Sequence, residues 1–93
     1  MKVRNMKSSN GNKVANQFEL YDNETMTSYF QSYDSIIVKI VRDMYTGKKV
    51  YLDSKTWNYS KTTSKYRSMF LGESTKETQK KIDSGEYILT NLN

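Results

Sequence analysis

The spacing of hydrophobic residues changes at Trp57, and this change constrains the fold more than any other feature of the sequence. Before Trp57 the pattern repeats every second residue, so that Phe18 and Leu20 would share one face of a half-buried strand. After Trp57 the hydrophobic residues recur three and four positions apart, as Tyr66 and Phe70 do, which indicates a helix. Strands followed by helices along one chain predict an α+β fold.

Four strands are expected in the first part of the chain, over residues 14–21, 27–33, 36–41 and 49–53. The segment Ile36–Val41 also fits one face of a helix, through the spacing of Ile37, Ile40 and Met44. However, five of its six residues are β-branched, and the turn-forming segment Tyr45–Gly47 follows it. A strand in a hairpin is therefore favoured over a helix.

Two helices are expected after Trp57. Gly72 stands where a glycine would end the first helix, and Ser74 with Glu77 forms a capping-box pattern that starts the second. Gly85 would close this second helix. The segment Tyr87–Thr90 then returns as a short edge strand.

These elements predict a small, mostly antiparallel sheet of four to five strands, with the two helices of the C-terminal half packed on one face. Residues 13–93 would form this single α+β domain. Residues 1–12 are polar and basic, lack a hydrophobic period and end in the turn-prone Asn10–Asn12. They are expected to form a flexible basic arm, with ordering on a partner as the alternative.

The composition restricts the possible functions. The chain of 93 residues is 35% hydrophobic and contains neither cysteine nor histidine. The low hydrophobic content predicts a small core, which a homodimer would help to stabilise. The absence of cysteine and histidine excludes disulfides and thiolate or histidine metal sites. We therefore expect a protein without cofactor or metal that is not an enzyme. No stretch has the length of a signal peptide core or a membrane span, so a cytoplasmic location and no membrane partner are expected.

The charge is unevenly distributed along the chain, whose formal net charge is +5. Residues 1–18 carry four positive charges and no negative ones, and residues 19–34 carry four negative charges and no positive ones. Residues 35–72 carry eight positive charges against two negative ones. An anionic partner is consistent with this excess.

A surface for nucleic acid is predicted where aromatic and basic residues alternate. Lysine and arginine would neutralise phosphates, a helix N-terminus would bind phosphate oxygens, and exposed aromatic rings would stack on bases. The residues of this predicted surface are Lys48, Lys49, Lys55, Trp57, Tyr59, Lys61, Lys65 and Arg67. The alternative is that Trp57 belongs to the core and that the lysines only face solvent.

A second candidate surface is acidic and rich in tyrosine, which suits an interface with a basic site on another protein. Its residues are Tyr21, Glu24, Tyr29, Tyr33 and Asp34. The alternative is that these tyrosines pair with neighbours inside the sheet.

Several segments over residues 10–93 resemble a small domain of unknown function that is encoded by phages, plasmids and other mobile elements of Gram-positive bacteria. The segments that carry the resemblance are Tyr29–Tyr33 (YFQSY), Trp57–Arg67 (WxYSxTTSKYR) and Phe70–Glu73 (FLGE). This family has no assigned activity, so the resemblance implies a setting and not a mechanism. By analogy with other small accessory proteins of mobile elements, we expect a non-enzymatic accessory protein that binds nucleic acid. The alternative is an inhibitor or adaptor that blocks a host enzyme, protein or ribonucleoprotein defence complex, in the manner of anti-CRISPR or anti-restriction proteins.

Overall fold

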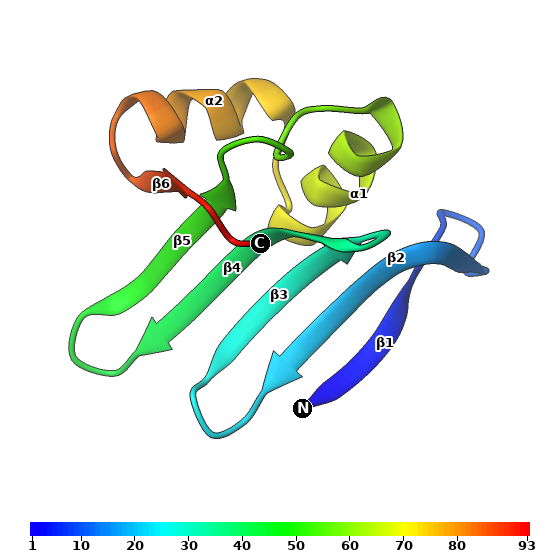
Figure 1. Cartoon of the computed structure of the whole chain (residues 1–93), viewed down its shortest axis with the longest axis horizontal. Coiled ribbons are helices and arrows are strands. Elements are labelled where there is room, and N and C mark those ends of the chain that lie inside the picture. Colours follow the sequence, from blue (N-terminus) through cyan, green and yellow to red (C-terminus); the bar gives the residue numbers. More distant parts are fainter.

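The computed structural model describes all residues from Met1 to Asn93. Its sheet has six strands, which lie side by side in the order in which they follow along the chain (Figure 1). The strands are β1 Lys2–Lys7, β2 Lys13–Asp22, β3 Thr27–Ser32, β4 Ser35–Asp43, β5 Gly47–Asp53 and β6 Tyr87–Thr90, and the helices are α1 Lys61–Leu71 and α2 Thr75–Asp83. Strands β1 to β5 are antiparallel, whereas β6 runs parallel to β5 because both helices lie in the connection between them.

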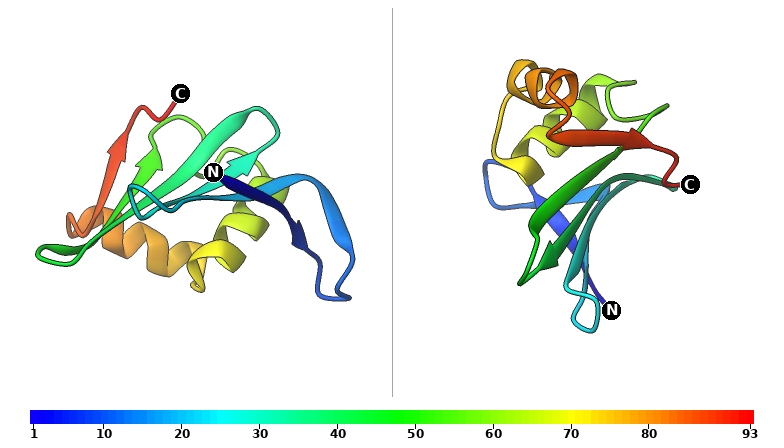
Figure 2. Two further views of the ribbon diagram at one scale, coloured as in Figure 1. Left: turned by 90° about the horizontal axis from the view of Figure 1, so that it is seen from below. Right: turned by 90° about the vertical axis from the view of Figure 1, so that its left-hand side faces the viewer.

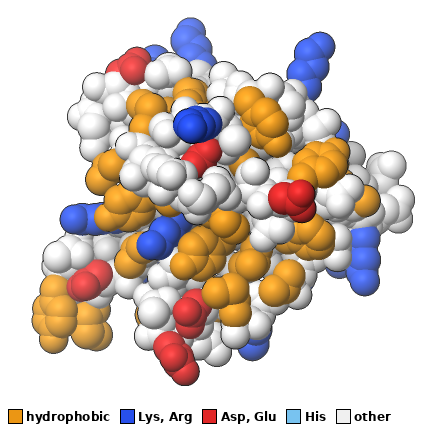
Figure 3. Space-filling view, viewed as in Figure 1, with side chains coloured by type: hydrophobic (Ala, Val, Ile, Leu, Met, Phe, Trp, Pro, Cys, Tyr) orange, Lys and Arg blue, Asp and Glu red, His pale blue; other side chains and the backbone are white.

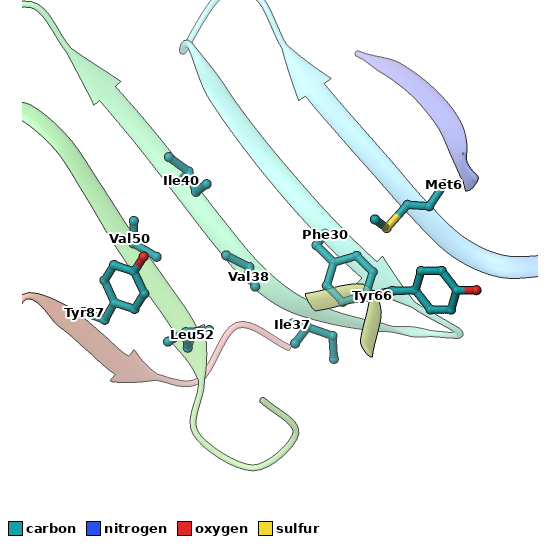
Figure 4. Close-up of a cluster of buried hydrophobic side chains, with 9 residues drawn as sticks. All are labelled: Met6, Phe30, Ile37, Val38, Ile40, Val50, Leu52, Tyr66 and Tyr87. Carbon is teal, nitrogen blue, oxygen red and sulfur yellow. The ribbon is translucent and has the colours of Figure 1, made fainter. Parts of the chain in front are cut away.

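Both helices lie on one face of the sheet and leave the opposite face uncovered (Figure 2). The core between the two layers consists of nine buried hydrophobic residues (Figure 4). Eight of them come from strands and one, Tyr66, comes from α1. Phe30, Val38 and Leu52 supply its centre, and Tyr66 of α1 covers one end. The predicted α+β architecture, a mostly antiparallel sheet with two C-terminal helices, is confirmed.

The strand count differs from the expected four to five, because the N-terminal segment forms a sixth strand. Lys2–Lys7, expected within a flexible arm, pairs with β2 as strand β1, and Met6 is buried in the core. An ion pair joins Arg4 to Glu19 across the two strands at 2.7 Å. The segment alone contains too few apolar residues to indicate a strand, and the open edge of β2 supplies the missing hydrogen bonds.

The segment Ile36–Val41 is a strand, as the β-branched composition predicted, and it lies within β4 between β3 and β5. Its apparent helical spacing has a structural cause. A β-bulge shifts the register between Phe30 and Gln31, so that Ile37 and Val38 are both fully buried although they are consecutive. Two adjacent buried residues interrupt the two-residue alternation that marks a regular strand.

The predicted helix boundaries are confirmed. Gly72 adopts φ 71° at the end of α1, the left-handed conformation that glycine tolerates best. Ser74 and Glu77 form the expected capping box at the start of α2, with reciprocal bonds of 3.1 Å and 3.0 Å. Neither helix is long and apolar enough to cross a membrane.

A buried hydrogen-bonded cluster fastens the link between the helices to strand β6. Its centre is Glu73, which accepts bonds from Tyr87 Oη at 2.7 Å and Thr78 Oγ1 at 2.6 Å and pairs with Lys81 Nζ at 2.9 Å. Although burial alone would raise the pKa of Glu73, these bonds together outweigh it and lower the pKa. Burial and the bond to Glu73 raise the pKa of Tyr87 to about 12.

This cluster predicts a loss of stability at both ends of the pH scale. The lowered pKa of Glu73 adds stability above its ordinary value of 4.5, and this stability is lost as the pH falls and the carboxylate is protonated. The raised pKa of Tyr87 adds stability that is complete below pH 10.0 and is lost as the pH rises towards about 12. Urea unfolding across the pH range measures both effects.

The variant Glu73→Gln isolates the acid limb, because it cannot titrate. We expect its free energy of unfolding to fall less steeply below pH 4.5 than that of the unchanged protein. Glu86→Gln, which removes an exposed carboxylate near the same strand, is the control and should keep the steep fall. Equal acid slopes in the unchanged protein and Glu73→Gln would contradict the role of this cluster.

Candidate nucleic-acid interface

The residues predicted to form one basic and aromatic surface do not lie together. Lys48 and Lys49 lie at the hairpin end of β5, where consecutive side chains point to opposite faces of the sheet. Lys55 and Lys61 lie beyond the other end of this strand, so roughly 20 Å of chain separates the two groups at about 3.3 Å per residue. Strand β5 therefore divides the predicted surface into two parts.

Arg67 belongs to the interior and not to a ligand surface, which corrects its predicted role. Its side chain is 0% exposed, and its guanidinium donates to the Trp57 carbonyl oxygen and to Thr75 Oγ1 at 2.6 Å. The guanidinium carbon also lies 5.2 Å from the centre of the Trp57 ring, and burial lowers the Arg67 pKa. Arg67 thus joins the loop after β5 to the start of α2. Trp57 itself is half-buried against the core.

The remaining residues near the start of α1 are exposed but do not converge on a site. Tyr59 and Lys61 border a shallow hollow, while the Lys65 ammonium lies over the Tyr66 ring at 5.4 Å. The hydroxyls nearby are already used within the fold, because Ser60 Oγ accepts from the Thr63 amide at 3.1 Å. Lys61 is the one lysine that borders this hollow, so the lysines of this end do not line a shared groove.

The acidic, tyrosine-rich set is also divided by the structure. Glu24 lies in the turn before β3, whereas Tyr33 and Asp34 lie in the turn after it, at the other end of that strand. Tyr29 faces away from the helices, and Tyr21 lies on the helix side of the sheet. These five residues therefore do not gather at one end or on one face of the sheet.

A groove on the helix side of the sheet gathers a different set of basic residues. Two adjoining hollows share Val3, Arg4 and Glu19, and the larger has a volume of about 690 Å³. We call this combined hollow the basic groove. Its cationic lining consists of Lys2, Arg4, Lys7, Lys13 and Arg42, against Glu19 as its single carboxylate.

The shape of the β1–β2 hairpin forms the groove. Asn16 adopts φ 64°, and the register between β1 and β2 shifts after Asn5, so the hairpin bends sharply. In Figure 2 (left) this hairpin curls from the sheet towards the side on which the helices lie. Met69 and Phe70, near the end of α1, line the groove from the helix layer.

The cations of the basic groove have few partners within the protein. Only Arg4 forms an ion pair, with Glu19, and Arg42 donates to Ser28 Oγ at 3.1 Å. Lys7 stands directly opposite Lys13 in the strand register, and Arg42 stands directly opposite Lys48. Like charges at opposite positions of a strand pair destabilise it. The fold itself does not explain why these charges are gathered here.

The signal for the basic groove was present in the sequence as a charge block. Four of its five cations, Lys2, Arg4, Lys7 and Lys13, are the four positive charges of residues 1–18. The sequence assigns most of this block to a basic arm, with ordering on a partner as the alternative, and does not predict that its charges line a groove. The fifth cation, Arg42, carried no distinguishing sequence signal.

Comparisons with known proteins add a family without a known activity. The model of a family described as a family of unknown function (DUF8033) matches residues 1–86, which include all of the basic groove and both helices. No curated protein and no solved structure gives a significant match.

Proposed function

The chain belongs to this family of unknown function, and we propose that it binds single-stranded nucleic acid in the basic groove. One observation carries the proposal: five cations line the two adjoining hollows of the basic groove, whose lining contains a single carboxylate. A phosphate backbone would relieve the repulsion between Lys7 and Lys13 and between Arg42 and Lys48. It would also release counterions on binding, which favours association at low salt.

The dimensions of the groove suit a short single strand. The groove follows β2 from Lys13 to Tyr21, a length of roughly 26 Å along the strand at about 3.3 Å per residue. This length accommodates about four nucleotides, the lower end of the range for compact single-strand binding domains. The proposed binding is independent of sequence, because cations that contact phosphates do not distinguish bases.

The apolar lining favours a single strand over a duplex. Tyr21 and Phe70 line the same hollow as Arg4 and Arg42, and so does the aliphatic Ile40 of β4. Unpaired bases can pack against such side chains while their phosphates contact the cations. A duplex keeps its bases stacked inside the helix and would leave this apolar lining uncovered.

Fluorescence anisotropy with labelled oligothymidine tests the proposal. The triple variant Lys7→Gln, Lys13→Gln, Arg42→Gln removes three cations of the basic groove. The changes at Lys7 and Lys13 also remove the repulsion between these two residues. We expect the affinity of the triple variant to fall roughly 30-fold at about 50 mM salt. The slope of log K against log salt should become less steep by about 2, because about 0.7 is lost for each phosphate contact.

A matched control removes the same charge from the other end of the molecule. The triple variant Lys55→Gln, Lys61→Gln, Lys65→Gln changes three exposed lysines of the initially predicted surface. We expect it to lose less than about threefold in affinity, through the reduced overall field alone. Equal losses in the two triple variants, no binding at low salt, or a preference for duplex would each contradict the proposal.

A further inference from the structure

The sheet face opposite the helices, which we call the open face, carries a continuous row of large side chains. The strand register aligns this row across all six strands, and its members are Val3, Leu20, Tyr29, Lys39, Tyr51 and Ile88. Figure 3 views this face and shows hydrophobic side chains spread across its middle. A sheet face that remains in water usually carries polar side chains instead. Val3 is 61% and Ile88 42% exposed, so the row extends to both edges of the sheet.

The open face is electrically balanced, in contrast to the basic groove. Lys39 and Lys49 lie on its β4–β5 side, and the register places Asp22 on β2 and Asp43 at the end of β4 on the same face. Two positive charges therefore face two negative ones. A nucleic acid needs an excess of positive charge, so a protein surface is the better complement for this face.

The charged side chains of the open face form no ion pair within the chain, although Lys39 lies over the Tyr51 ring at 6.0 Å and Asp22 accepts from the Glu24 amide at 3.0 Å. Lys49 and Asp22 lie in a second row of the open face, with Val41 and Thr27 between them. Three strand spacings of about 4.8 Å therefore separate the strands of Lys49 and Asp22. These two residues form no ion pair; the ion pairs of the chain are Arg4 with Glu19 and Lys81 with Glu73. At this spacing Lys49 can meet Asp22 only on another molecule.

We propose that two copies of the chain pack open face to open face, about a twofold axis that runs parallel to the strands between β3 and β4. This axis exchanges β4 with β3 and β5 with β2. It therefore places Lys49 opposite Asp22 of the second copy, and Lys39 opposite the Tyr29 ring of the second copy. Tyr51 meets Leu20 of the second copy in the same way. Lys49, Lys39 and Tyr51 thus each face a complementary side chain of the second copy.

The dimer leaves the cations of the basic groove free, because they lie on the helix side of the sheet, although Val3 and Leu20 border both the groove and the open face. Two sheets pack about 10 Å apart with their strands roughly aligned, which a twofold axis parallel to the strands provides. The two grooves then lie on the outer surfaces of the dimer. Dimerisation and nucleic-acid binding are separate properties, and one can fail without the other.

Sedimentation velocity over a range of protein concentrations, without nucleic acid, tests this dimer. We expect the unchanged chain to dimerise and each of the variants Asp22→Lys and Lys49→Asp to raise the dissociation constant roughly tenfold, since every dimer contains the pair twice. The double variant Asp22→Lys, Lys49→Asp restores opposite charges and should return the constant to within about threefold of its original value.

Two further variants control for other effects of the charge changes. Asp22→Asn keeps an acceptor for the Glu24 amide, which Asp22 Oδ1 accepts at 3.0 Å, and should weaken the dimer less than Asp22→Lys. Lys76→Asp reverses an exposed charge in the first turn of α2, where an acidic residue is tolerated, and should leave the dimer unchanged. A monomer at all concentrations, or a dimer that neither single reversal weakens, would overturn the proposal.

Discussion

Replacing Arg67 with alanine is expected to lower the free energy of unfolding by about 3 kcal/mol. The substitution leaves the Trp57 carbonyl oxygen and the Thr75 hydroxyl without the guanidinium that both contact. It also opens a cavity, because Arg67 is the largest fully buried side chain of the protein. The loop after β5 and the start of α2 would lose the side chain that joins them. Urea unfolding followed by circular dichroism measures the change.

Two controls separate this effect from a simple loss of charge. Arg67→Lys keeps the charge, but a single ammonium cannot span the Trp57 carbonyl and the Thr75 hydroxyl as the planar guanidinium does, so most of the loss should remain. Lys65→Ala removes an exposed cation from the same helix and should change stability by less than about 0.5 kcal/mol. An unchanged midpoint in Arg67→Ala would show that this side chain is not an internal support.

Replacing Phe30 with alanine is expected to lower the free energy of unfolding by about 3–5 kcal/mol. Phe30 is 0% exposed at the centre of the sheet, and its ring stacks on Phe70 of α1 with centroids 5.8 Å apart. The helix layer therefore loses its main aromatic contact with β3 as well as the buried area of the ring. A domain of this size is typically stable by about 5–10 kcal/mol, so the variant would be only marginally folded at room temperature.

The graded substitution Phe30→Leu tests the same contact with a smaller cavity. It should cost less than about half of the loss in Phe30→Ala, because most of the apolar volume is kept. Tyr45→Ala removes an aromatic ring that is 90% exposed in the β4–β5 turn and should leave the thermal midpoint unchanged. A similar loss in Phe30→Leu and Tyr45→Ala would contradict the packing of Phe30 in the core.

The position of each cation, more than its identity, decides its role in this protein. Arg67 and Lys65 are two residues apart on α1, yet one is enclosed by a loop and a second helix and the other faces solvent. Burial around Arg67 depends on Thr75 and on the Trp57 backbone, which no spacing within α1 reveals. A pattern of alternating aromatic and basic residues therefore does not distinguish an internal guanidinium from a ligand contact.

The sequence by itself determined the features that depend on neighbours a few residues away. The two-residue period predicted the central strands, Gly72 predicted where α1 ends, and Ser74 predicted where α2 begins, because these signals act within one turn or one strand. The β-branched composition of Ile36–Val41 similarly favoured a strand over a helix.

Only the tertiary structure decided the features that depend on pairing between distant segments. Lys2–Lys7 becomes a strand because the edge of β2 is available to it, and the bend at Asn16 carries its cations towards Arg42. The open face is likewise defined by register, which aligns residues from six strands into one row. The physical reason is that local propensity acts along the chain, whereas a groove or a face is formed by side chains that meet only after the sheet has assembled.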